Sequence, residues 1–232
     1  MTASGRSMTV SIIVPTLDED RTIVRLLSDL APLRAQGHEV LLVDGGSRDD
    51  TREAAAALAD RVISGPRGRA RQMNAGAQSA RGDILWFLHA DTRVPAQALE
   101  AILHACGSGE RTWGRFDVRL SGKHWLLRIV EHMMNLRSRL TGIATGDQGL
   151  FVTRAAFGAV SGFPDIPLME DIAMSRSLRD HGRPACVRSP RLQTSSRRWE
   201  QNGIVSTILL MWRLRLAYAM GTPPGELAKR YH

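Results

Sequence analysis

The 232-residue sequence has only two cysteines, Cys106 and Cys186, and neither belongs to a Cys-x-x-Cys or Cys/His pattern. A disulfide framework or structural zinc site is therefore not expected, and both residues are interpreted as reduced, partly buried thiols. Long apolar runs are missing too, since no uninterrupted stretch approaches the roughly 20 residues that a membrane-spanning helix needs. Residues 1–8 are small and polar, unlike a signal peptide. We therefore expect a cytoplasmic protein.

Aromatic residues are scarce, at 5% of the sequence, whereas basic residues are in excess and give a formal net charge of +8. A basic protein attracts anionic partners such as nucleotides, nucleic acids or an anionic membrane surface. A nucleic-acid-binding protein is one interpretation, but no stacking motif or helix-turn-helix pattern supports it. We therefore expect no nucleic-acid partner.

The first half of the chain alternates apolar runs with helical patterns. The runs at residues 10–14, 39–43, 62–63 and 84–88 are typical of buried strands, and helical periodicity lies between them. Alternation with short links predicts an α/β protein whose parallel sheet has right-handed crossovers. Pro15 has no amide hydrogen to donate, so we expect the chain to leave the sheet there.

The second half is less regular. Helices are predicted at residues 96–105, from about 125 to 136, from near Asp171 to about 180, and from about 204 to 216. Strands are predicted near 150–152 and 185–187. Another is predicted where Phe116, Val118 and Leu120 alternate with polar residues, as in a half-buried strand. No repeat or linker divides the chain. We expect a flexible N-terminus (1–8), a catalytic domain (9–200, divided at residue 95) and a C-terminal amphipathic helix and tail (201–232).

Five stretches, in order along the chain, resemble motifs of the family 2 glycosyltransferases. They are residues 11–19, residues 43–51, Gly68-Arg69 with Asn74-Ala75-Gly76, His89-Ala90-Asp91 and Glu170-Asp171. The resemblance implies a GT-A-type nucleotide-diphospho-sugar transferase fold, with a mostly parallel central sheet flanked by helices. It also implies a hexosyltransferase-type enzyme that moves a sugar from a UDP- or GDP-sugar to a hydroxyl acceptor. The nucleotide-binding half would be 9–95 and the acceptor half 96–200.

The resemblance also places the donor site. The implied nucleotide-sugar-binding residues are Pro15, Thr16, Leu17, Glu19, Asp44, Gly45, Arg69, Arg71, Asn74, His89, Ala90 and Asp91. Asp44 could accept hydrogen bonds from a nucleobase or ribose, although a turn residue in Asp-Gly-Gly-Ser is the alternative. Arg69 and Arg71 carry forked donors that suit a diphosphate, whereas Arg67 is interpreted as a solvated loop residue.

His89-Ala90-Asp91 occupies the place of the family's Asp-x-Asp metal motif. Asp91 would bind Mn²⁺ or Mg²⁺, which would neutralise charge on the departing nucleoside diphosphate. His89 replaces the usual first carboxylate and is a second candidate ligand. An imidazole suits Mn²⁺ better than Mg²⁺, and a ribose, phosphate or core contact is the alternative for His89.

Glu170-Asp171 occupies the place of the family's acceptor motif. Asp171 is the candidate general base, which would take the proton of the acceptor hydroxyl in an inverting transfer. Glu170 could orient the acceptor or alter the pKa of Asp171 through its like charge. Alternatively, both acids simply favour a helix N-terminus.

The acceptor side is predicted to include Asp147, Gln148, Arg198 and Trp199. Arg198-Trp199 loosely resembles a motif of processive members, but Ser195 stands where that motif has glutamine, which argues against a polymer synthase. The C-terminal helix could pack on the domain, mediate a homo-oligomer, or rest peripherally on the inner face of the cell membrane, which would fit a lipid-linked acceptor.

Two other interpretations concern the nucleotide-sugar class. A sugar-nucleotide pyrophosphorylase would carry a basic glycine-rich loop directly after the first strand, where residues 15–19 offer none. A non-catalytic nucleotide-sugar-binding protein would fit the replacement at His89, and turnover of a donor with an acceptor would distinguish it from an enzyme.

Overall fold

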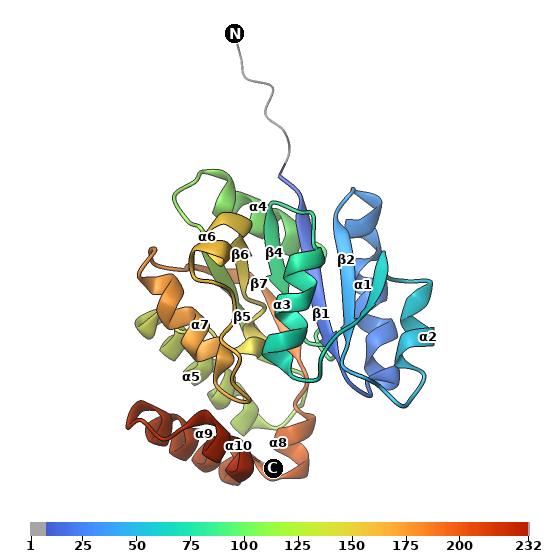
Figure 1. The fold of residues 1–232 in the computed structure, drawn as a ribbon. Coiled ribbons are helices and arrows are strands. Elements are labelled where there is room, and N and C mark those ends of the chain that lie inside the picture. The colour runs from blue at the N-terminus through green and yellow to red at the C-terminus, as the bar shows by residue number, and fades with distance from the viewer. Residues whose placement is uncertain (1–7, 232) are drawn as a thin grey trace.

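A computed structural model describes residues 8–231, so the predicted flexible segment 1–8 lies outside the described residues except for Met8. Seven strands form one sheet in the order β3-β2-β1-β4-β6-β5-β7 (Figure 1). All pairs are parallel except those of β6, which is antiparallel to β4 and β5. The predicted α/β fold with a mostly parallel sheet is confirmed. The strands are β1 (Val10–Thr16), β2 (Glu39–Asp44), β3 (Arg61–Ser64), β4 (Ile84–Phe87), β5 (Trp113–Leu120), β6 (Phe151–Thr153) and β7 (Ala185–Thr194).

Helices cover both faces of the sheet, because its central strands are apolar on both sides. Ile12 and Val14 of β1 pack into one hydrophobic cluster, and the intervening Ile13 packs into another. The helices are α1 (Asp20–Ala35), α2 (Thr51–Ala56), α3 (Arg69–Ser79), α4 (Ala98–Gly107), α5 (Trp125–Thr141), α6 (Arg154–Ala159), α7 (Glu170–Arg179), α8 (Arg197–Gln201), α9 (Ile204–Ala219) and α10 (Pro224–Tyr231), with a short 3₁₀ helix, η1 (Gly146–Gln148).

The strand order places a ligand crevice between β1 and β4. From β1 the chain passes through α1 to β2 on one side, whereas α3 leads from β3 back to β4 on the other side of β1. The connections therefore diverge at the carboxyl ends of β1 and β4, where open α/β sheets bind their ligands.

Pro15 does not end the first strand, contrary to our prediction. It remains in register with Val43 of β2, and Thr16 pairs with Asp44. Alternate residues of a strand direct their backbone groups to the same side, and the Ile13 carbonyl accepts from Leu88 on the β4 side. The nitrogen of Pro15 therefore faces the side where pairing with β4 has ended, and no ladder hydrogen bond is lost there.

The second half also differs from its predicted form. We expected the polar residues that alternate along β5 to be exposed. Arg119 and Ser121 are exposed, but Asp117 is fully buried under α5, where it forms an ion pair with the buried Arg115. Arg139 of α5 also pairs with Asp117, and Asn135 bonds the backbone of Val118, so the helix satisfies this polar face. The helix predicted from about 204 to 216 is confirmed as α9, and a further helix, α10, lies in the predicted tail.

In the part of the chain that the structure describes, none of the helices is long and apolar enough to cross a bilayer.

Candidate active site

The loops after β1 and β2 form the first wall of the crevice. Gln72 of α3 is buried beneath them and donates to the carbonyls of Thr16 and Val43, both at 2.8 Å. A Cβ added to Gly45 would lie 3.0 Å from the Gln72 side chain, which explains the glycine at that position. Asp18 accepts from the Arg48 amide at 2.7 Å. These bonds hold the two loops in a fixed relation.

Asp44 lies in this first wall, buried at the end of β2. Its carboxylate accepts from the amides of Gly46 and Ser47 at 3.2 Å and from the Ser47 hydroxyl. Arg52 lies 3.5 Å away. These contacts are those of the turn interpretation of Asp44. Pro15 and Thr16 end the neighbouring strand β1, and Leu17 and Glu19 follow in the loop after it.

The predicted binding residues of α3 point in different directions. Arg69, in the first turn, faces Glu170, with Nη1 3.4 Å from Oε1. Arg71 points to the surface and pairs with Asp165 at 2.7 Å. Asn74 forms two hydrogen bonds with the backbone of Phe163, so its amide fixes the loop before α7. Of the three, Arg69 is the residue that lines the pocket.

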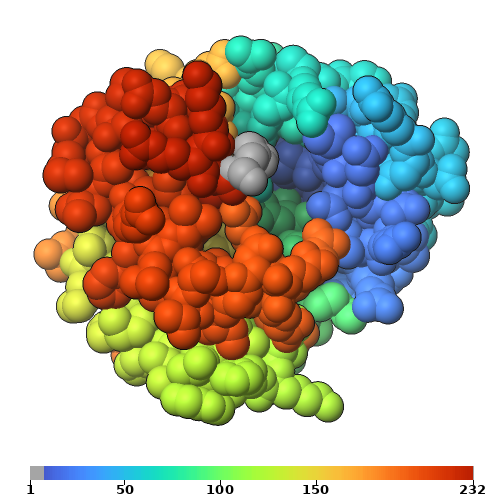
Figure 2. Space-filling model, turned by 90° about the horizontal axis from the view of Figure 1, so that it is seen from below, coloured from blue at the N-terminus to red at the C-terminus, as the bar shows by residue number. Residues whose placement is uncertain are grey.

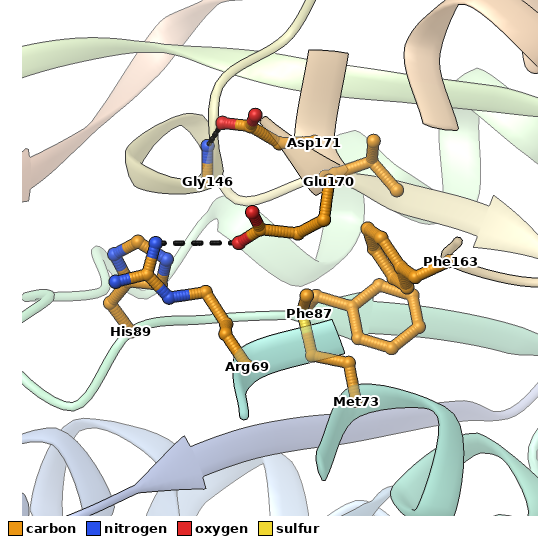
Figure 3. Close-up of a pocket in the computed structure, with 9 residues that line it drawn as sticks. Arg69, Met73, Phe87, His89, Gly146, Phe163, Glu170 and Asp171 are labelled. Carbon is orange, nitrogen blue, oxygen red and sulfur yellow. Dashed lines mark hydrogen bonds and ion pairs between the residues drawn. The ribbon is translucent and has the colours of Figure 1, made fainter. Parts of the chain in front are cut away.

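The pocket lies between the first turns of α3 and α7, the end of β4, and η1 (Figure 3). Arg69, His89, Glu170 and Asp171 line its polar side, while the apolar side is formed by Met73, Phe87, Leu150 and Phe163. His89 and Asp171 both contact Gly146. The Asp171 carboxylate accepts from the Gly146 amide at 2.8 Å, and a Cβ added to Gly146 would lie 2.6 Å from His89 Nε2.

Asp171 has the electrostatic properties of a base near neutral pH. Burial raises the pKa of Asp171 to about 6, and the like charge of Glu170 adds to the rise. The amides of Gly146 and Ile172 and the charge of Arg69 oppose it. A carboxylate with a raised pKa is a stronger proton acceptor than an ordinary surface aspartate.

His89 is a neutral imidazole in this pocket. Burial, assisted by Arg69, lowers the pKa of His89 to about 3. Its Nε2 is buried and has no hydrogen-bond partner among residues 8–231. Buried polar atoms are nearly always satisfied, so this nitrogen is a candidate contact for a ligand.

Asp91 and Asp147 form the acidic part of the site. Burial raises the pKa of Asp91, with a further contribution from Asp147, whereas Arg197 lowers it. Burial also raises the pKa of Asp147, whose Oδ1 is buried without a partner in the described chain. An orphaned carboxylate oxygen close to a second carboxylate fits a divalent cation, which prefers oxygen ligands. No three His, Cys, Asp or Glu side chains within residues 8–231 form a complete metal centre.

The remaining predicted acceptor-side residues make internal contacts. Gln148 is fully buried and completes a capping box with Thr145. The guanidinium of Arg198 lies 3.6 Å from the centre of the Tyr231 ring, and Trp199 packs with α5 and α9. These two residues hold the C-terminal helices against the domain.

The sequence interpretation missed three residues. Gln72 bridges the first two loops, Arg197 acts on Asp91, and Arg137 of α5 interacts electrostatically with Asp147 and Asp171. Nε and Nη2 of Arg137 are buried without hydrogen-bond partners in the described part of the protein. Gln72 lies three positions after Arg69, one helical turn away on the inner side of α3, and that spacing is the only sequence signal for any of them.

Solved structures share this architecture at low sequence identity. The TarS fragment 1-349 of S. aureus has a TM-score of 0.68 and 18% identity, over 82% of this chain and 61% of that one. The mannosyltransferase PcManGT from Pyrobaculum calidifontis, solved with GDP-Man and Mn²⁺, has a TM-score of 0.62 and 22% identity, over 82% of this chain and 57% of that one. Glucosyl-3-phosphoglycerate synthase from Mycobacterium tuberculosis, solved with Mg²⁺ and UDP, has a TM-score of 0.61 and 21% identity, over 81% of this chain and 70% of that one. These similarities define the fold as that of the GT-A transferases.

The sequence comparisons identify the family. Residues 11–157, more than half of the chain, match Glycosyl transferase family 2, and the chain belongs to this family. An undecaprenyl-phosphate 4-deoxy-4-formamido-L-arabinose transferase of Pseudomonas aeruginosa is 28% identical over 152 residues, 60% of this chain and 44% of that protein. The enzyme with the same name in Yersinia pestis is 28% identical over 153 residues, covering 60% and 46%. The chain thus spans less than half the length of these relatives.

Proposed function

We propose that the protein is an inverting glycosyltransferase that moves a sugar from a UDP- or GDP-sugar to a hydroxyl acceptor, with Asp171 as the general base. The observation that carries this proposal is the Asp171 carboxylate, which has a raised pKa and is fixed by the Gly146 amide beside Arg69 and His89. Glycosyl transfer with inversion needs such a base to accept the acceptor proton as the hydroxyl attacks the anomeric carbon.

The donor would lie across the crevice between the first wall and the pocket. The base and ribose would occupy the side of Pro15, Thr16, Asp44 and Gly45. Arg69 would bind phosphate oxygens, since its guanidinium is half exposed beside the pocket and its fork suits phosphate. His89 Nε2, as a neutral group, would contact the donor without adding charge.

Asp91 and Asp147 would hold a Mn²⁺ or Mg²⁺ ion together with the diphosphate. The ion would supply charge neutralisation for the leaving nucleoside diphosphate. Arg197 forms no salt bridge among the described residues, and its charge acts on Asp91. It would therefore add positive charge beside this site. Two of the three named structural neighbours, PcManGT and glucosyl-3-phosphoglycerate synthase, were solved with Mn²⁺ and Mg²⁺ respectively, which supports this assignment.

A lipid-linked acceptor is the class that the curated relatives suggest, because both carry undecaprenyl phosphate in their names. We propose a hydroxyl group of a polyprenyl-linked molecule as the first acceptor to test, with processive synthesis not expected.

Calorimetric titration tests the donor site directly. Wild-type protein is titrated with UDP and with GDP, each with Mn²⁺, Mg²⁺ or EDTA, and the series is repeated with Asp91→Ala and Asp147→Asn. We expect binding of one nucleotide that needs the metal and that both variants weaken. Absence of binding by either nucleotide under every condition would refute the proposed site, and binding that EDTA does not change would refute the metal.

A further inference from the structure

Two rows of large apolar side chains are exposed on α5 and α9. In each row the residues follow at intervals of three or four, so each forms one stripe along its helix. Their exposed fractions range from 36% to 76%; the α5 row comprises Trp125, Ile129, Met133, Leu136 and Leu140, and the α9 row comprises Val205, Leu209, Trp212, Leu216 and Met220. Each row is about 22 Å long at 1.5 Å per residue.

The exposed rows are a second apolar face on each helix. The inner faces pack normally: Leu127 and Val130 of α5 cluster with Ile204 and Ile208 of α9, and Leu214 of α9 is buried against the α7 region. Trp125 and Met133 of α5, by contrast, are exposed. None of the side chains of the two rows belongs to a hydrophobic cluster of residues 8–231.

The two rows belong to the same outer face. The first turns of α9 pack on the first half of α5, and its later turns share a cluster with Ile143, which follows the end of α5. The helices therefore run in the same direction, and their exposed rows lie on neighbouring helices. Figure 2 shows the C-terminal helices and α5 side by side. We call this surface the α5/α9 face.

The α5/α9 face holds ten of the eleven large apolar residues that are exposed among residues 8–231. The eleventh is Val24 of α1. Single exposed apolar residues are ordinary, but a contiguous group on adjacent helices marks an interaction surface.

The charge around this face identifies the kind of partner. Residues 123–141 and 204–231 contain eight lysines and arginines but only two acids, Glu131 and Glu226. Glu131 is buried and pairs with Arg128, so it adds no exposed negative charge. Three of the basic residues are engaged with the domain: Arg137 faces the active site, Arg139 pairs with Asp117, and Arg128 donates to backbone carbonyls. The other five are Lys123, Arg213, Arg215, Lys229 and Arg230.

We propose that the α5/α9 face docks onto the surface of a bilayer that contains anionic lipids. Apolar side chains between basic residues, with exposed tryptophans at Trp125 and Trp212, have the composition of helices that lie in the membrane interface. A second copy of this chain is a poorer partner for the same face, because self-association would bring two sets of basic residues together.

Docking would place the active site beside the lipid. The outer side of α5 carries the apolar row, and its inner side carries Arg137, whose charge acts on Asp147 and Asp171. A lipid-linked acceptor could then reach the site without leaving the bilayer; this consequence rests on the proposed function, whereas the docking itself does not.

Vesicle flotation and tryptophan fluorescence test the docking without donor or acceptor. Wild-type protein is mixed with phosphatidylcholine vesicles that contain no phosphatidylglycerol or a third of it, at low and high salt. We expect flotation with the anionic vesicles, weakened by salt, and a blue shift of the emission, because Trp125 and Trp212 would leave water. Trp86 and Trp113 are fully buried and should not respond.

Row variants locate the contact. Leu209→Asp with Leu216→Asp, and separately Ile129→Asp with Leu140→Asp, should each lower the vesicle partition coefficient by at least about tenfold. Val24→Asp, at the exposed apolar position outside the face, is the matched control and should bind as wild type does. Far-UV circular dichroism and nucleotide titration verify that each variant is folded, since all the substituted side chains are exposed.

Three results would overturn the proposal. The first is absence of flotation of the wild type with anionic vesicles at low salt. The second is an equal loss of binding in the Val24→Asp control. The third is a dimer in light scattering that the row variants dissociate, which would assign the face to a second copy. A failure of glycosyl transfer with normal flotation would count against the proposed function and not against the docking.

Discussion

The two walls of the crevice differ in whether their buried polar groups have hydrogen-bond partners. In the first wall, after β1 and β2, Asp44 is buried but bonded to Gly46, Ser47 and Arg52, and Gln72 satisfies two carbonyls. In the second wall, formed by the end of β4, η1 and the start of α7, His89 Nε2 and Asp147 Oδ1 are buried without partners in the described chain. The buried polar groups of the first wall that are named here have hydrogen-bond partners within the protein. The second wall has buried polar atoms that a bound ligand could pair with.

This contrast indicates that the first wall is a preorganised binding surface and that the second wall is the reactive centre. The bonded groups of the first wall have a fixed shape. The second wall contains Asp171, Asp91 and His89, whose pKa values are all shifted by burial. Chemistry is therefore expected at the second wall, and substitutions there should affect turnover more than substitutions in the first.

The largest effect is expected for Asp171→Asn. The amide keeps the shape of the side chain but cannot accept the acceptor proton, so kcat should fall by about 10²–10⁴-fold. Nucleotide binding should remain within a few-fold of wild type. Steady-state kinetics and calorimetry give the two quantities.

Asp180→Asn is the control for this variant, because Asp180 is exposed at the other end of α7. It should leave kcat unchanged. Equal losses in both variants would mean that helix stability, and not the base, limits the rate.

The next effect is expected for Gly146→Ala. The new methyl group would meet His89 Nε2 and displace the amide that holds Asp171, so kcat/KM should fall about 10-fold to 100-fold, and overpacking should lower the free energy of unfolding by about 1–3 kcal/mol. Gly158→Ala in α6 meets no atom within 4 Å and should be neutral or slightly stabilising. If Gly146→Ala has the activity of the wild type, neither His89 nor the position of the Gly146 amide contributes to catalysis.

The pH dependence of activity should show the same base. Because the pKa of Asp171 is raised to about 6, and only the ionised carboxylate accepts a proton, kcat/KM should decline about tenfold per pH unit below pH 6. A profile that remains flat down to pH 4.5 would contradict the raised pKa.

The same shift predicts a stability change of defined sign. A raised pKa in the folded state means that folding disfavours the ionised carboxylate, so Asp171→Asn should increase the free energy of unfolding above pH 6, by about 3 kcal/mol. The difference should shrink as the pH falls below 6 and disappear below about pH 3, where the carboxyl is protonated in both states. Urea unfolding at pH 8 and at about pH 3 measures it.

The smallest effect on turnover is expected in the first wall. Gln72→Ala removes two buried hydrogen bonds and should lower the free energy of unfolding by about 1–3 kcal/mol, with weaker nucleotide binding but a kcat within a few-fold of wild type. Gln78→Ala is the matched control on the exposed side of α3 and should be neutral. A large loss of kcat in Gln72→Ala would show that the first wall also takes part in the chemistry.

Much of the fold could be predicted because its signals are local. The apolar runs of β1, β2 and β4 are buried on both faces, and each is followed by the polar residues that mark the crevice. The pairing of Glu170 with Asp171 at a helix start was visible in the same way. Pro15 was misjudged because its effect depends on which neighbour strand its nitrogen faces, and that is a property of the sheet.

The sequence alone predicted the alternating strands and helices of the first half, the family resemblance, and the polar side chains that line the pocket. The tertiary structure decided which of them act together. It turned Asn74 and Arg71 away from the pocket, buried Arg115 with Asp117, brought Arg137 to the site, and left two apolar rows outside the domain. The physical reason is that burial and partnership depend on distant elements: helix periodicity shows that a side has apolar residues, but only packing determines whether that side meets protein or solvent.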